Sequence, residues 1–138
     1  MKIGYLLCRK HLKTIFHDII TMKKRTRNMM PSIISYRPKR SWVAVLGRVF
    51  TTKYTLKILK DFLYYIEEDT VCIEQASLAY VFLREIGKTC TLYIGYSDNP
   101  VINFHAWVVC DDCFFFEVKE EMQIICEYPS NQMKNVNN

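Results

Sequence analysis

The order of the periodic patterns along the chain predicts an α+β fold, with helices first and an antiparallel sheet after them. Through most of residues 2–86, apolar side chains recur every three or four positions, which is the spacing of a helix face. After Gly87 the period changes to two, which is the alternation of a strand. The chain has 138 residues and is 50% hydrophobic, which suffices for one compact domain with its own core.

The first 50 residues are predicted to contain one long helix and a connector. Residues 2–24 have apolar side chains at helical spacing among lysines, which is typical of a basic amphipathic helix. His11 and His17 are expected on its surface. Residues 23–40 are charged and contain two prolines, which favours a loop. Residues 41–50 are apolar, and their pattern fits a helix or a strand.

Two further helices are predicted before the sheet. Residues 52–67 carry their large apolar side chains on one side. Residues 71–86 are apolar on most faces, which indicates a buried helix. Asp69 and Thr70 are its N-cap candidates, and Gly87 lies at its C-terminal end.

Four strands are predicted after these helices. Residues 89–96 alternate in polarity, residues 101–110 form a second strand, residues 114–118 a third and residues 122–127 a fourth. Residues 111–112, a pair of aspartates, are expected to form a tight turn between the second strand and the third.

The charge is divided unevenly along the chain. Residues 1–60 contain 15 Lys/Arg and one acidic residue, whereas residues 61–138 contain four Lys/Arg and 13 acidic residues. No apolar run has the roughly 20 residues that a membrane span needs. A short apolar start is cut by Arg9 and Lys10, and it lacks the features of a secretory signal. We therefore expect a cytoplasmic protein whose six cysteines are thiols.

The basic half has three candidate uses besides a solvated face: binding nucleic acid, peripheral contact with a membrane, or docking a protein partner. Nucleic acid is disfavoured because the sequence contains no recognition motif. A docking face would include Lys10, Lys13, Lys23 and Lys24 on the first helix.

Cys72 and His105 are the residues with the clearest chemical potential. Cys72 lies at the start of a helix, where unpaired backbone N–H groups and the helix dipole favour the thiolate. His105 lies in the middle of an apolar strand, where an imidazole is unusual. A cysteine on a helix facing a histidine on a strand is the arrangement of papain-like thiol catalysis. The alternative is that both residues only pack in the core.

Cys110 and Cys113 form a single C-x-x-C motif across the predicted turn. Zinc needs two further ligands, and a redox-active C-x-x-C opens a helix rather than flanking a hairpin. Packing of two small apolar side chains across the hairpin is therefore the favoured interpretation.

Three segments together resemble the leader peptidase of lasso-peptide biosynthesis, a branch of the transglutaminase-like, papain-like cysteine proteases. These segments are the Cys-led helix 72–87, the strand segment Leu-Tyr-Ile-Gly at 92–95, and Phe-His-Ala-Trp-Val at 104–108. The resemblance covers about 50 residues. It implies a papain-like or transglutaminase-like core with the nucleophile at a helix N-terminus.

By this resemblance Cys72 is the nucleophile and His105 the general base and then acid. Glu117 takes the place of the family's third residue, an aspartate, and Asp111 and Asp112 are its rivals. A two-residue hairpin loop would set Glu117 opposite Ala106, with its side chain away from His105. The assignment of Glu117 therefore predicts a three-residue loop or a bulge near residues 111–113.

The resemblance also implies the reaction and its partners. Cys72 would remove the leader from a lasso-peptide precursor without a metal or cofactor. A separate leader-recognition protein would be needed, because the N-terminal segment is too short for the family's own recognition domain, and an ATP-dependent cyclase would act beside it. The implied organisation is a basic segment at 1–50, a peptidase core at 51–129 and a flexible tail at 130–138. The alternatives are a transglutaminase-like acyltransferase and a non-catalytic adaptor.

Overall fold

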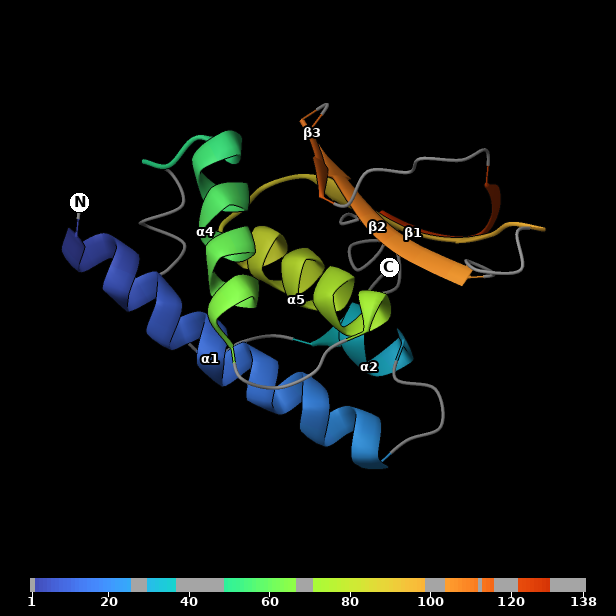
Figure 1. The fold of residues 1–138 in the computed structure, drawn as a ribbon, viewed down its shortest axis with the longest axis horizontal. Coiled ribbons are helices and arrows are strands. Elements are labelled where there is room, and N and C mark those ends of the chain that lie inside the picture. Colours follow the sequence, from blue (N-terminus) through green and yellow to red (C-terminus); the bar gives the residue numbers. More distant parts are fainter. Residues whose placement is uncertain are drawn as a thin grey trace, which may run out of the picture.

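A computed structural model describes most of the chain. The described residues are 2–25, 30–36, 49–66, 71–98, 104–111, 113–115 and 122–129. They contain the helices α1 (Lys2–Arg25), α2 (Met30–Ser35), α4 (Thr52–Tyr65) and α5 (Cys72–Glu85). They also contain the strands β1 (Cys90–Tyr96), β2 (Phe104–Cys110), β3 (Cys113–Phe115) and β4 (Gln123–Pro129). The predicted α+β class is confirmed: α1 and α4 lie on one side of α5, and the sheet lies on its other side (Figure 1).

Helix α4 has a side-chain cap and one apolar face. The hydroxyl oxygen of Thr51 accepts a hydrogen bond from the backbone N–H of Tyr54 at 3.2 Å, which satisfies one of the free donors of the first turn. Leu59 and Phe62, at helical spacing, are buried against the rest of the core.

Helix α5 begins within one residue of its predicted start, although its cap differs from the prediction. The N-cap residue is Val71, whose side chain has no acceptor. Asp69 and Thr70, the predicted caps, lie outside the described residues. The backbone N–H of Val71 instead donates to the carboxylate of Glu74 at 3.3 Å, the reciprocal half of a capping box.

The predicted loop at residues 23–40 is wrong over its middle part, where the chain forms the short helix α2. Pro31 lies in the first turn of α2, where its missing N–H costs nothing. The guanidinium of Arg84, on α5, donates to the carbonyl oxygens of Ile33 at 3.3 Å and Ile34 at 2.8 Å. The carbonyl of Ile33 also accepts from the backbone N–H of Tyr36 at 3.3 Å, so the bond to Ile34 is the one that satisfies a carbonyl near the end of this short helix.

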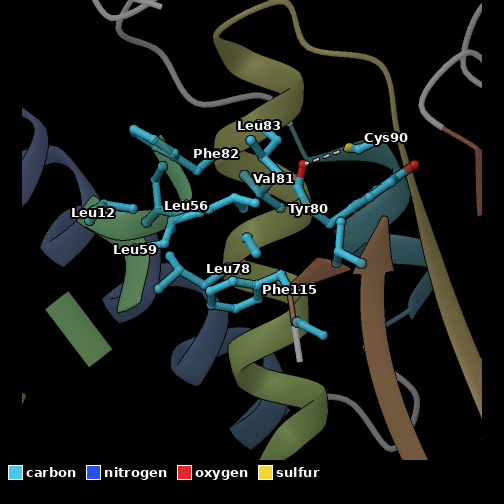
Figure 2. Close-up of a cluster of buried hydrophobic side chains, with 14 of the residues drawn as sticks. Leu12, Leu56, Leu59, Leu78, Tyr80, Val81, Phe82, Leu83, Cys90 and Phe115 are labelled. Atoms are coloured by element: carbon cyan, nitrogen blue, oxygen red, sulfur yellow. Dashed lines mark hydrogen bonds between the residues drawn. The ribbon is translucent and has the colours of Figure 1, made fainter. Parts of the chain in front are cut away.

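Helix α5 is the centre of the hydrophobic core. Figure 2 shows Leu12 of α1 and Leu59 of α4 on the side of α5 that carries Leu78 and Phe82. Phe115 of β3 reaches the same cluster from the sheet. The helices at the N-terminus and the sheet at the C-terminus therefore share one core through α5.

His11 is buried, and its predicted surface position is wrong. Its side chain is 1% exposed, and its Nε2 lies 2.5 Å from a carboxylate oxygen of Glu85. This polar pair joins α1 to the last turn of α5 inside the core. His17, by contrast, is exposed as predicted.

The sheet is antiparallel, with strand order β3-β2-β1-β4. β1 and β2 are the two inner strands. Gly95 of β1 pairs with His105 near the start of β2, and Tyr93 pairs with Trp107. The pairing of β1 with β4 shifts register between Ile94, which pairs with Cys126, and Gly95, which pairs with Ile124.

The β2–β3 hairpin has a two-residue loop, so the predicted three-residue loop or bulge is wrong. Cys110 pairs directly with Cys113 at its end. Asp111 adopts a positive φ of 48°, which two-residue hairpin loops require. Its carboxylate accepts a hydrogen bond from the hydroxyl of Thr52 at 2.5 Å, which ties the loop to the start of α4.

The two faces of the sheet have different neighbours. Leu92 and Val108 project toward the core, and both have zero exposure. On the same face, the thiol of Cys90 lies 3.9 Å from the carbonyl oxygen of Tyr80 on α5. Side chains alternate along a strand, so His105 and its neighbours at odd positions of β2 project from the opposite face.

Candidate active site

Cys72 is the first residue of α5, and its side chain is half-buried. Backbone N–H groups of a first helical turn have no partner within the helix, and they stabilise negative charge close to them. Ala76 and Ala79 are fully buried, so the helix that holds Cys72 is packed tightly behind it. The first turn that carries Cys72 is therefore held rigidly against the core.

The first turn of α5 is also held by a charged contact. The carboxylate of Glu74 is 4% exposed, and it accepts hydrogen bonds from the backbone N–H of Val71 and from the ammonium of Lys23 on α1. Lys23 is one of the lysines predicted to form a docking face, but its ammonium contacts α5. A glutamate three residues after the N-cap is the sequence signal that could have revealed the capping half of this contact.

His105 lies near the start of β2 and is half-buried. Its ring stacks beside that of Trp107, with a centroid distance of 6.0 Å and an angle of 18° between the planes. Burial lowers the pKa of His105 below its usual value of 6.5, because the imidazolium loses hydration. The imidazole is therefore neutral near pH 7, the form in which it can accept a proton.

Trp107 forms the wall beside His105. Its ring stacks on Tyr93 at a centroid distance of 5.4 Å. A Cβ atom added to Gly95 would lie 2.9 Å from two carbons of the Trp107 ring. The indole thus fits against β1 only because residue 95 is a glycine.

The topology brings Cys72 and His105 to the same end of the domain. The connection from Glu85, the last residue of α5, to Cys90 is short, so β1 runs back along α5. The end of β1, the start of β2 and the start of α5 therefore lie at one end of the layered helix and sheet (Figure 1).

The structure does not join the two side chains directly. His105 projects from the sheet face opposite to the one that packs on α5, and no hydrogen bond links it to Cys72, both being described residues. A contact between the thiol and the imidazole would have to form around the end of the sheet.

The β2–β3 hairpin does not support any of the residues predicted to orient His105. Glu117 and Asp112 lie outside the described residues. The resemblance suggests Glu117, and geometry allows it only with an odd loop or a bulge. The regular two-residue loop does not meet that condition and so counts against Glu117. Asp111 lies six residues from His105 along the chain, about 20 Å at the rise of a strand, so it cannot orient the imidazole.

Three other cysteines have an environment that opposes nucleophilic chemistry. Burial raises the pKa of Cys8 to about 11, that of Cys90 to about 12 and that of Cys110 to about 11. Their thiols stay protonated at neutral pH. Within the described ranges, no group of three His, Cys, Asp or Glu side chains is placed to hold a metal ion, and Cys113 is only the hairpin partner of Cys110.

A model of the transglutaminase-like superfamily matches residues 51–124, just over half of the chain. The chain therefore belongs to the transglutaminase-like superfamily. The matched segment runs from the start of α4 into β4 and includes Cys72 and His105. No curated protein and no solved structure matches the chain. In the described part, no helix is long and apolar enough to cross a membrane.

Proposed function

We propose that this protein is a cysteine peptidase in which Cys72 is the nucleophile and His105 is the base. One observation carries the proposal: the segment that matches the superfamily begins its buried helix at Cys72 and brings His105 to that same end of the domain. The side chain of Cys72 is only half-buried, so a substrate can reach it, whereas Cys90 is fully buried.

The reaction proceeds in two steps. His105 accepts the proton of the Cys72 thiol, and the thiolate attacks a peptide carbonyl carbon. Backbone N–H groups of the first turn of α5, that of Cys72 included, stabilise the oxyanion. The imidazolium then gives its proton to the leaving amine, and a thioester remains on Cys72. Water, deprotonated by His105, hydrolyses the thioester and restores the thiol.

The substrate we propose is the leader region of a lasso-peptide precursor. The support is the sequence resemblance of the Cys72 helix and of the Phe-His-Ala-Trp-Val strand at 104–108. A separate leader-recognition protein would present the precursor, and an ATP-dependent cyclase would take the product. Glu117 is not proposed as the residue that orients His105, because the two-residue loop fails the condition on which that assignment depended.

The nucleophile can be tested without a known substrate by alkylation with iodoacetamide across a range of pH. Peptide mass mapping follows the rate at Cys72 in the wild type and in His105→Ala. If neutral His105 accepts the proton of the Cys72 thiol, Cys72 reacts faster at neutral pH in the wild type than in the variant, and the difference shrinks at alkaline pH. An identical pH profile in both proteins would contradict the dyad.

The peptidase activity is tested by incubating the protein with a lasso-peptide precursor and the leader-recognition protein, and following the masses. We expect a leader fragment from the wild type and none from Cys72→Ala. The rate should fall as the pH drops through the lowered pKa of His105, below 6.5, because the protonated ring cannot act as a base. Transfer of the acyl group to an added amine, without hydrolysis, would favour the acyltransferase instead. Equal product from Cys72→Ala would refute both.

A further inference from the structure

A groove of about 570 Å³ lies between α1 and α4, away from the β-sheet. Its wall on α1 is formed by residues on one side of that helix, and its wall on α4 by the last turn of α4 and the residue that follows. The lining residues are Arg9, Lys13, Phe16, His17, Ile20, Thr21, Lys24, Phe62, Tyr65 and Ile66.

The floor of the groove is apolar and well packed. Phe16 and Phe62 meet edge to face at a centroid distance of 6.3 Å, and both are buried. Tyr65 stands at the rim and is 61% exposed. The guanidinium of Arg9 lies over its ring, 5.9 Å from the centroid. Such a floor would accept an aliphatic or aromatic side chain, and the arginine would lie beside its backbone.

The rim of the groove is basic. Arg9, Lys13 and Lys24 are exposed, and among the described residues that line the groove none is acidic. The described lining therefore carries an excess of positive charge, which attracts acidic groups. This distinguishes the groove from the start of α5, where the ammonium of Lys23 contacts Glu74.

The groove leads toward the candidate active site. Arg9 and Lys24 are 15 positions apart on α1, so the lined stretch is about 22 Å long at the rise of an α-helix. An extended peptide of about six or seven residues would fill it. Lys24 follows Lys23, whose contact with Glu74 brings this part of α1 beside the first turn of α5.

We propose that this groove binds an acidic segment of a second polypeptide, with an apolar side chain of that segment on the Phe16–Phe62 floor. A concave site with an apolar floor fits a peptide better than a flat membrane surface. Nucleic acid is less suited, because the aromatic ring that a base would stack on is Tyr65, which Arg9 already covers. The inference concerns binding alone and does not depend on the chemistry of Cys72.

The test uses fluorescence anisotropy with a labelled peptide of about ten residues that alternates glutamate with leucine and phenylalanine. A peptide with lysine in place of glutamate is the negative probe. The paired substitutions Lys13→Glu and Lys24→Glu should weaken binding about tenfold or more, because each turns an attraction into a repulsion. Added salt should weaken binding to the wild type.

The matched control carries Lys10→Glu and Lys57→Glu, which change the net charge equally. Both lysines are exposed, and neither lines the groove. We expect this control to retain the wild-type affinity within about threefold, since only screened, long-range attraction is lost. Thermal unfolding of both variants checks that the fold is kept.

Several outcomes would overturn the inference. Equal losses in the two double variants would show that only net charge matters. Equal affinity for the lysine peptide would remove the electrostatic argument. Binding to phosphatidylserine vesicles or to a single-stranded RNA without binding to the acidic peptide would assign the basic face to another partner. Cys72→Ala should bind the peptide as the wild type does, so failure of the catalytic proposal would leave this result unchanged.

Discussion

Gly95 is the position where the smallest change should have a well-defined effect. In Gly95→Ala the new Cβ would lie 2.9 Å from Cζ3 and Cη2 of Trp107 and 3.3 Å from the carbonyl oxygen of Gln123. Carbon atoms in contact normally lie about 3.5–4.0 Å apart, so the indole must move by about 0.6 Å or more. Trp107 is 5% exposed and is stacked on Tyr93, which leaves it little room.

The cost of this overpacking should be about 1–3 kcal/mol. Alanine restricts the unfolded chain more than glycine does, which offsets about 0.5–1 kcal/mol. We therefore expect Gly95→Ala to lower the free energy of unfolding by about 1–2 kcal/mol. Urea denaturation measures this value, and the melting temperature should fall by about 3–8 °C for a chain of this length.

A double-mutant cycle isolates the clash from other effects. Trp107→Phe removes the two ring carbons that the new Cβ would meet, so the cost of Gly95→Ala should nearly vanish in that background. Gly87→Ala is the control. Gly87 has a φ of 81° and no atom within 4 Å of an added Cβ, so it should cost about 1–2 kcal/mol through backbone strain alone, with or without Trp107. An equal cost of Gly95→Ala in both backgrounds would refute the packing argument.

Three further predictions concern the core, the hairpin and the thiols. Leu59→Ala should lower the free energy of unfolding, measured by urea denaturation, by about 2–5 kcal/mol, because Leu59 is 0% exposed. A loss below about 1 kcal/mol would contradict the burial of Leu59 in the core. Thr52→Val should cost about 1 kcal/mol, since it removes the bond to Asp111, and it should be neutral in an Asp111→Gly background, which lacks the acceptor, if that bond is the cause. Cys90 should resist iodoacetamide at pH 8 in the folded protein and react after denaturation, because burial raises its pKa to about 12; fast reaction in the folded state would contradict this burial.

Most of the regular elements were predictable because their patterns are local. The predicted helix at 71–86 corresponds to α5 at Cys72–Glu85, and the predicted strand at 89–96 corresponds to β1 at Cys90–Tyr96. Residues 71–86 form a mostly apolar segment that is too long for a typical strand and ends before Gly87, and residues 89–96 alternate with the period of a strand. The short helix α2 escaped prediction because its stability comes from Arg84, a residue distant in the sequence that donates to its last carbonyls.

The hairpin and the buried histidine were mispredicted for related reasons. The length of the β2–β3 loop depends on the positive φ of Asp111, which the hydroxyl of Thr52 helps to hold from another element. His11 looked like a surface residue on a basic helix, and only the packing of α1 on α5 sets it against Glu85. In both cases the partner lies more than 50 residues away, where sequence spacing carries no information.

The sequence by itself determined the α+β class, the residues of α5 and β1, and Cys72 and His105 as the candidates for catalysis, because periodicity and residue type are local properties. Tertiary structure alone decided which lysines are available for binding. Lys23 and Lys24 are neighbours in a basic run, yet the ammonium of Lys23 contacts Glu74 whereas Lys24 lines the groove between α1 and α4. That difference arises because consecutive residues of a helix point about 100° apart, and only the packing of α1 against α4 and α5 decides what each one faces.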